Sequence, residues 1–284
     1  RHLEKRGNQI AIIREPNDPN EKFRTLTYNE LSREVNRFAN VLLANGVKKG
    51  ARVCIYLPMI PEAAIAMLAF ARIGAVHYVV FAGFAPHTIR DRINDSACEV
   101  VITADGFSRG EKMFELKKTV DEAVEKTTSI KKCIVFNHRN LPINMRAGRD
   151  LWWHEEIEKV SAENKAEMME AEAPLFILYT SGSTGKPKGV VHTTAGYMVY
   201  CPYTFNTVFQ YQDGDVFFST ADVGWITGHS YLVYGPLLRG ATTIMFEGVP
   251  TFPNAGRFWE IIDKHKVNIF YTAPTAIRSL MAFG

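Results

Sequence analysis

Apolar side chains recur along the chain in two patterns, either at helical spacing or in short uninterrupted runs. The clearest helical pattern follows residues 27–30 (TYNE), which have the form of a capping box, and it ends near Gly46. A second helix is predicted to begin at Pro61 and to end at Gly74. The remaining helices are predicted near 87–94, at about 111–126, after Thr194, near 229–238, at 257–265 and from Pro274.

The short apolar runs between these helices predict strands. They lie at 53–57, 76–81, 100–103, 133–136, 175–179, 216–219, 242–246 and 267–271. Strands that are apolar throughout and alternate with helices are typical of a mostly parallel sheet that is covered on both faces. We therefore predict an α/β protein with two linked, mostly parallel sheets and helices on both faces of each.

The predicted division of the chain places a first α/β subdomain at residues 1–172, including a polar surface connection at 137–172, and a second at 173–284. The second part holds only 13 of the 63 charged side chains. A domain that is complete by itself normally has a more charged surface. We therefore expect this chain to be the first part of a large N-terminal domain, with some faces of its second half covered by the rest of the protein.

Composition excludes several classes of protein. With 284 residues, 46% hydrophobic and 22% charged, the chain is neither disordered nor collagen-like. Its net charge of +3 does not predict the basic face that nucleic-acid binding requires. Apolar runs such as 63–71 are far shorter than the roughly 20 residues that span a bilayer. We expect a cytoplasmic protein with neither a nucleic acid nor a membrane as partner.

The four cysteines and eight histidines show no spacing that predicts a metal site. Cys54, Cys98, Cys133 and Cys201 include no CxxC pair. In a chain of this length they are expected to be reduced, buried thiols. No metal ligand is predicted within this sequence.

The segment 180–189 (TSGSTGKPKG) carries the strongest chemical signal, because it directly follows a predicted strand. Ligands of open parallel sheets bind beyond the carboxyl ends of the strands. Three glycines allow close backbone approach, and hydroxyl groups and two lysines suit a polyphosphate. The spacing differs from that of the common nucleotide P-loop, and Pro187 removes one backbone N–H from any such cradle. We predict a mobile clamp for phosphate groups. The alternative, a surface linker, is disfavoured by the apolar residues on both sides.

Four motifs resemble a known superfamily. Residues 179–190 resemble the signature of the adenylate-forming superfamily, which contains acyl-CoA synthetases, peptide-synthetase adenylation domains and luciferases. Residues 221–231 (ADVGWITGHSY), 246–250 (FEGVP) and 271–278 (YTAPTAIR) are similar to the AMP-forming acetyl-CoA synthetase family within it. The resemblance covers essentially the whole chain.

This resemblance implies a two-step ligase. ATP and acetate would give acetyl-adenylate and pyrophosphate, and CoA would then take the acetyl group as a thioester. ATP, CoA and Mg²⁺ are the expected cofactors and co-substrates. The motif that binds adenine and Mg²⁺, the ribose-binding Asp, the catalytic Lys and the Trp that caps the acetyl pocket are expected beyond residue 284. We therefore expect residues 1–284 alone to have no ligase activity.

The resemblance also implies roles for individual residues. The predicted phosphate-binding residues are Thr180, Ser181, Gly182, Ser183, Thr184, Gly185, Lys186 and Lys188, of which Thr180, Ser181 and Lys186 are the catalytic candidates. The predicted CoA-binding residues are Gly83, Arg109, Gly110, Glu111, Lys112, Thr227 and Thr251. The predicted acyl pocket consists of Trp225, Ile226 and Thr227. Lys112 replaces an arginine that is common in the family, and Thr251 replaces a frequent asparagine.

Other interpretations of the same residues remain open. The enzyme could prefer propionate or a medium-chain acid, and a nucleotide-binding module without catalysis is the alternative from a different class. Residues 109–112 could be a solvated basic start of a helix, and residues 225–227 could be ordinary core. The segment 228–232 (GHSYL) approaches the nucleophile elbow of serine hydrolases but lacks its second glycine.

Overall fold

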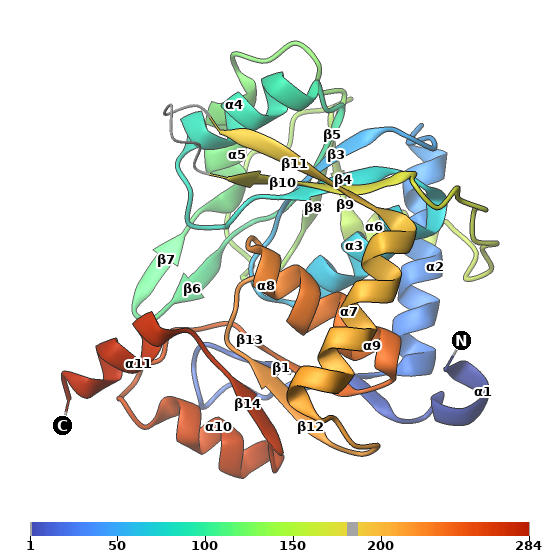
Figure 1. Cartoon of the computed structure of the whole chain (residues 1–284). Helices are drawn as coiled ribbons and strands as arrows, with labels where there is room; N and C mark the ends of the chain where they lie inside the picture. Colours follow the sequence, from blue (N-terminus) through green and yellow to red (C-terminus); the bar gives the residue numbers. More distant parts are fainter. Residues whose placement is uncertain (1, 181–186, 284) are drawn as a thin grey trace.

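The computed structural model describes residues 2–180 and 187–283. Figure 1 shows two sheets, one above the other, with helices between them and on their outer faces. In the described part of the chain the strand orders are β11-β10-β4-β3-β5-β8-β9 and β14-β12-β13-β1-β2, and β6 and β7 form a separate hairpin. This arrangement confirms the predicted α/β class.

The seven-stranded sheet is parallel at every pairing except that of β10 with β11. Its strands are β3 (Arg52–Tyr56), β4 (Val76–Val79), β5 (Val100–Ala104), β8 (Lys132–Phe136), β9 (Asp150–Trp152), β10 (Pro174–Thr180) and β11 (Lys188–Thr193). The central strands β3, β4 and β5 are mostly apolar, and all their residues except Arg52 are buried. Because both faces of the sheet are covered, the apolar runs in the sequence predicted β3, β4, β5, β8 and β10 correctly. No run predicted β11, or β9, which lies within the predicted surface connection.

The five-stranded sheet is parallel apart from the pairing of β1 with β2. Its strands are β1 (Ile10–Glu15), β2 (Arg24–Thr27), β12 (Val216–Ser219), β13 (Thr242–Phe246) and β14 (Ile269–Tyr271). Each sheet therefore takes strands from both sides of residue 172. The sheets do not coincide with the two predicted units, and the domain boundary at residue 172 stays a prediction.

Helices cover both sheets (Figure 1). The helices seen between the sheets are α3 (Pro61–Ile73), α7 (Thr194–Phe209), α8 (Ile226–Gly228) and α9 (Gly235–Arg239), with the π-helical segment η1 (His229–Tyr234) joining α8 to α9. The seven-stranded sheet carries α4 (Pro86–Ser96) and α5 (Leu116–Val124) on its outer side, and α10 (Arg257–His265) covers the five-stranded sheet. The others are α1 (Leu3–Arg6), α2 (Tyr28–Ala44), α6 (Trp153–Glu158) and α11 (Pro274–Met281).

Local signals in the sequence fix the two best predicted helices. The Thr27 side chain accepts a hydrogen bond from the Glu30 N–H (3.2 Å), and the Glu30 carboxylate accepts one from the Thr27 N–H (2.8 Å). This confirms the capping box at the start of α2. Helix α3 begins at Pro61, and Gly74 follows it with a φ of +69°. A left-handed conformation at this position favours glycine.

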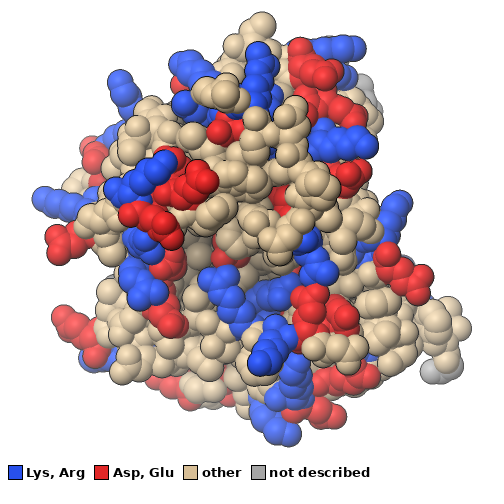
Figure 2. Space-filling view, turned by 180° about the vertical axis from the view of Figure 1, so that it is seen from behind, with Lys and Arg blue, Asp and Glu red and all other residues tan. Residues whose placement is uncertain are grey.

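Burial bears out the expectations about cysteines. All four are buried and free. Burial raises the pKa of the Cys133 thiol to about 12, so it stays protonated at neutral pH. Within the described ranges, the structure contains no helix long and apolar enough to cross a membrane. Figure 2 shows Lys and Arg interspersed with Asp and Glu over the face opposite that of Figure 1.

The helix predicted at about 111–126 is wrong in its first turn. Residues 107–114 form instead the β6–β7 hairpin, with β6 at Phe107–Arg109 and β7 at Lys112–Phe114. The two phenylalanine rings stack across the strands with their centroids 5.0 Å apart, and Gly110 makes the turn with a φ of +61°. Helix α5 begins only at Leu116. The interpretation of residues 109–112 as a solvated helix start is therefore wrong.

Candidate functional site

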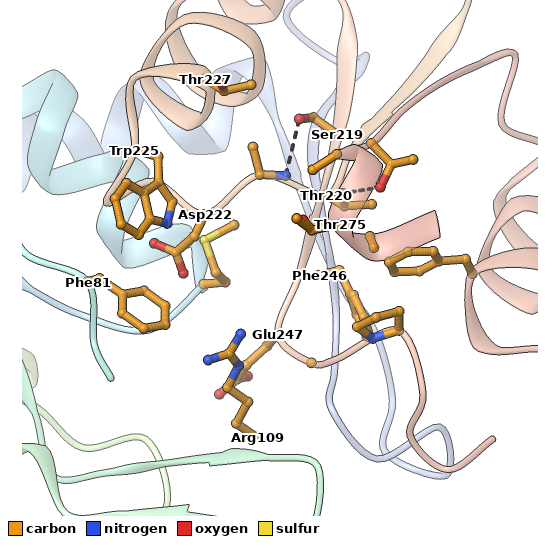
Figure 3. Close-up of a pocket in the computed structure, with 18 of the residues that line it drawn as sticks. Phe81, Arg109, Ser219, Thr220, Asp222, Trp225, Thr227, Phe246, Glu247 and Thr275 are labelled. Carbon is orange, nitrogen blue, oxygen red and sulfur yellow. Dashed lines mark hydrogen bonds between the residues drawn. The ribbon is translucent and has the colours of Figure 1, made fainter. Parts of the chain in front are cut away.

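A cavity of about 810 Å³ lies where the strands of both sheets end. One wall consists of the residues that end or follow the parallel strands β12, β13 and β14, at 219–222, 246–248 and 271–276. The other wall comes from the loops after β3 and β4 and from the β6–β7 hairpin. Figure 3 shows side chains from both walls pointing into the cavity. This is the edge at which open α/β sheets bind their ligands.

The turn after β12 presents Trp225 to this cavity. The Asp222 carboxylate accepts a hydrogen bond from the Gly224 N–H (2.7 Å), and the Asp222 carbonyl accepts one from the Trp225 N–H (3.1 Å). A Cβ at Gly224 would come within 3.0 Å of the Phe81 backbone, and a Cβ at Gly228 would come within 2.1 Å of the Asp222 carbonyl oxygen. The glycines in the GWITG segment are therefore required by close backbone contacts.

The indole of Trp225 is 51% exposed, so it is not an ordinary core residue. Its ring centroid lies 6.2 Å from that of Phe81 and 6.2 Å from that of Phe84. Thr227 lines both this cavity and a second one of about 540 Å³, and Ile226 lines the second. The interpretation of residues 225–227 as core is therefore wrong.

Asp222 and Arg109 face the same space. Burial raises the pKa of Asp222 to about 6, although the Gly224 hydrogen bond and the positive charge of Arg109 act in the opposite direction. The Arg109 guanidinium lies over the Phe81 ring, 5.1 Å from its centroid. Figure 3 shows it extending from the β6–β7 hairpin into the cavity, on the side of Asp222. The cavity therefore offers a cation and a carboxyl group that titrates near pH 6.

Glu247 also lines the cavity, but its carboxylate is already paired with protein groups. It accepts a hydrogen bond from Arg14 Nε (3.2 Å) and lies 2.6 Å from His138 Nε2. Its side chain is buried. We infer that Glu247 stabilises the wall of the cavity rather than contacting a ligand directly.

Comparison of the sequence with known protein families and proteins assigns this chain to a family. The model of the family described as AMP-binding enzyme matches residues 1–284. The chain belongs to the AMP-binding enzyme family. It is 61% identical to the acetyl-coenzyme A synthetase of Parvibaculum lavamentivorans and 59% identical to that of Magnetococcus marinus, over the whole chain in each case. It is also 59% identical to acetyl-coenzyme A synthetase 2 of Pseudomonas aeruginosa. The chain spans 44% of the length of each of these relatives.

In this member of the AMP-binding family, two of the residues predicted to bind CoA, Arg109 and Thr227, line the cavity. A Cβ at Gly83 would come within 2.5 Å of the Phe81 ring, over which Arg109 lies. The turn at Gly110 packs beside Val249 and Phe252, the segment that includes Thr251. Glu111 and Lys112 are exposed in the same hairpin, and Thr227 lies on the cavity wall. The structure thus brings these predicted residues together, while their role remains a prediction.

The predicted phosphate loop is only partly described. Ser181, Gly182, Ser183, Thr184, Gly185 and Lys186 lie outside the described residues. Thr180 ends β10 and is paired with Lys188 at the start of β11. Because β10 runs parallel to β4, Thr180 lies at the same edge of the sheet as Phe81. The position of this strand end agrees with the prediction that the segment follows a strand.

Sequence reasoning assigned no role to three residues that shape the cavity, Phe81, Asp222 and Glu247. Phe81 ends a predicted strand, and Asp222 and Glu247 each follow one within a few positions. Their position at the ends of predicted strands could have identified them as candidate site residues, because the carboxyl ends of parallel strands meet at one edge of a sheet. Over residues 2–180 and 187–283, no group of three or more His, Cys, Asp and Glu side chains is arranged to hold a metal ion.

Proposed function

We propose that the full-length protein is a ligase that activates acetate. It joins acetate and ATP to give acetyl-adenylate and pyrophosphate, and then transfers the acetyl group to CoA. The observation that carries this proposal is the 59–61% identity, over every residue of the chain, to relatives named acetyl-coenzyme A synthetase. The cavity supports it, because it lies at the strand ends and is large enough for part of a nucleotide-sized ligand.

Two separate groups of residues in this chain bind the phosphate groups of ATP and of CoA. Ser181, Thr180 and Lys186 hold the β- and γ-phosphates of ATP through hydroxyl groups and positive charge, with the remaining loop residues and Lys188 around them. Arg109 and Lys112 hold the 3′-phosphate of CoA. Mg²⁺, bound by residues outside this chain, would neutralise phosphate charge. Trp225, Ile226 and Thr227 surround the acyl group.

The direct test uses the full-length protein. Acetate-dependent exchange of pyrophosphate into ATP measures the first step, and acetyl-CoA formation measures the second. Both activities are expected. A protein that binds ATP but supports neither activity with any short-chain acid would instead be a nucleotide-binding module without catalysis.

We expect kcat/KM to be highest for acetate, lower for propionate and poor for butyrate. Ile226 is β-branched and therefore stiff, and a wall of this kind rejects one added methylene by about 1–3 kcal/mol, or roughly 10–200-fold. Because Ile226 lines the second cavity and Thr227 lines both, Ile226→Gly should move the preference toward longer acids. Ile226→Leu, which keeps the volume, is the control. Butyrate within tenfold of acetate in the wild type would contradict the assignment to acetate.

Arg109→Ala is expected to raise the KM for CoA by about tenfold or more, because a hydrogen bond to a charged group contributes about 1.5–3 kcal/mol. Acetate-dependent pyrophosphate exchange should remain intact, since CoA takes no part in it. The wild type should discriminate against dephospho-CoA, and the variant should not. Lys118→Ala is the control, because Lys118 is exposed and paired with Glu115 (3.4 Å). Equal relative use of dephospho-CoA by wild type and Arg109→Ala would show that Arg109 does not read the 3′-phosphate.

A further inference from the structure

The turn of the β6–β7 hairpin is held by a side chain from a distant loop. Asn17 Nδ2 donates a hydrogen bond to the Gly110 carbonyl (2.9 Å), and the Gly110 N–H donates one to Asn17 Oδ1 (2.7 Å). The side-chain amide thus pairs with Gly110 as a second strand would. Asn17 lies in the loop between β1 and β2 and is only 6% exposed. Gly110 is the residue that directly follows Arg109.

The base of the hairpin is fixed by a different contact. The buried Asp105 carboxylate accepts hydrogen bonds from the backbone N–H groups of Gly106 (2.8 Å), His138 (2.8 Å) and Leu141 (2.8 Å). These bonds hold the start of the hairpin against the loop after β8. They do not reach the turn, where Gly110 has a φ of +61°. Asn17 therefore sets the turn while Asp105 sets the base.

The carboxamide of Asn17 satisfies both groups of Gly110. It offers an acceptor to the N–H and a donor to the carbonyl, whereas a carboxylate offers acceptors alone. The loop that carries Asn17 is held at two other points. Glu21 accepts a hydrogen bond from Arg139 Nη1 (2.6 Å), and the buried Glu15 lies directly before the loop. The Asn17 side chain that pairs with Gly110 is thus buried, while Arg109, the residue before Gly110, is exposed.

We propose that Asn17 is a positioning residue for the CoA site. By holding Gly110, it fixes the direction in which Arg109 leaves the turn, so that the guanidinium lies over Phe81 and extends into the cavity (Figure 3). This inference rests on the proposed function, in which Arg109 binds the 3′-phosphate of CoA. Asn17 acts through Gly110 and Arg109 and contacts no substrate.

The test compares variants of the full-length protein. Asn17→Ala should raise the KM for CoA about tenfold, as expected if Arg109, once the Gly110 turn is no longer held, loses its hydrogen bond to the 3′-phosphate. The kcat at saturating CoA and acetate-dependent pyrophosphate exchange should stay unchanged, and discrimination against dephospho-CoA should fall. Asn17→Asp, which keeps only an acceptor, should not restore the KM. Asn20→Ala is the matched control, because Asn20 is exposed in the same loop and its side chain bonds Asp18 (3.0 Å).

A double-mutant cycle separates positioning from general loss of structure. In the Arg109→Ala background, Asn17→Ala should raise the KM for CoA no further. An equal increase in both backgrounds would overturn the proposal. If Asn17→Ala also abolishes pyrophosphate exchange, Gly110→Ala perturbs the same turn independently, since its φ disfavours alanine while the new Cβ stays 3.5 Å from Val249. That variant should show the same selective increase. An Arg109→Ala variant with an unchanged KM for CoA would instead remove the proposed role of Arg109 itself.

Discussion

Replacing Glu15 by alanine is expected to lower the free energy of unfolding of this domain by about 3–5 kcal/mol, because it breaks a buried ion pair on one side only. The Glu15 carboxylate is fully buried and accepts hydrogen bonds from Arg257 Nη2 (2.7 Å) and Lys264 Nζ (2.9 Å). His265 Nε2 lies 2.6 Å from its other oxygen. Arg257 is itself 1% exposed, and the variant would leave this buried cation with only the distant, half-exposed carboxylate of Glu260 (3.8 Å).

The pH dependence of this effect follows from the pKa of Glu15. Burial alone would raise the pKa, but the hydrogen bonds from His265, Lys264 and Arg257 outweigh it and lower the pKa from 4.5 to about 2. Between these values the unfolded chain binds more protons than the folded one. The stabilisation by Glu15 is therefore complete above about pH 4.5 and is lost as the pH falls toward 2.

Urea unfolding of the full-length wild type and Glu15→Ala at pH 7 and at lower pH measures both points. The difference in stability should be largest at neutral pH and should shrink as the pH approaches 2. Glu99→Ala is the control, because Glu99 forms an exposed pair with Lys131 (2.7 Å), and such pairs contribute about 0–1 kcal/mol. Equal effects of the two substitutions would show that the Glu15 cluster is no stronger than a surface pair.

The features that the sequence predicted well are those that depend on neighbouring residues. The capping box at Thr27 and the proline and glycine that bound α3 act through contacts within a few positions, and each central strand is marked by its own run of mostly apolar residues. The sequence also predicted the Gly224 and Trp225 segment as a site candidate, and Trp225 lines the cavity while its role stays a prediction. The motif corresponds to a tight turn in the structure. Glycine is needed at position 224 because a Cβ there would come within 3.0 Å of the Phe81 backbone.

The features that the sequence did not predict depend on pairing between distant segments. Strand β1 ends in two buried charged residues, Arg14 and Glu15. Arg14 is paired with Glu247 and Glu15 with Arg257, and each partner lies more than 200 positions away in the chain. Strand β11 forms by antiparallel pairing with β10, although four of its six residues are exposed and its pattern does not alternate. A local reading of charge and hydropathy contains no information about such partners.

The same limit applies to the candidate site. Arg109 was identified by its motif, but a charged segment with few apolar residues also fits a helix start, which was the competing interpretation. The hairpin depends on the Phe107–Phe114 stack and on Asn17, which lies in the loop between β1 and β2 of the five-stranded sheet. The direction of the Arg109 side chain is therefore a tertiary property, and it could not be predicted from residues 104–112 alone.

Substituting Lys186 with alanine is expected to slow acetyl-adenylate formation by the full-length protein by about 2–4 kcal/mol in the transition state, or roughly 30- to 1,000-fold. The proposed partners of Lys186 are the β- and γ-phosphates, on which negative charge develops as pyrophosphate leaves. Ser181→Ala should act in the same direction. Both residues lie outside the described part of the structure, so the prediction rests on the sequence motif and on the place of Thr180 at the carboxyl end of β10.

The second half-reaction provides the internal control for Lys186. Pyrophosphate has left before CoA reacts, so thioester formation from acetyl-adenylate supplied directly should proceed at nearly the wild-type rate. Pyrophosphate exchange and single-turnover thioester formation, measured on the same preparation, separate the two steps. Lys186→Arg keeps the charge and should lose less of the exchange activity than Lys186→Ala. Equal losses in both half-reactions would contradict the proposal, because they would show that the loop does more than stabilise the leaving phosphates.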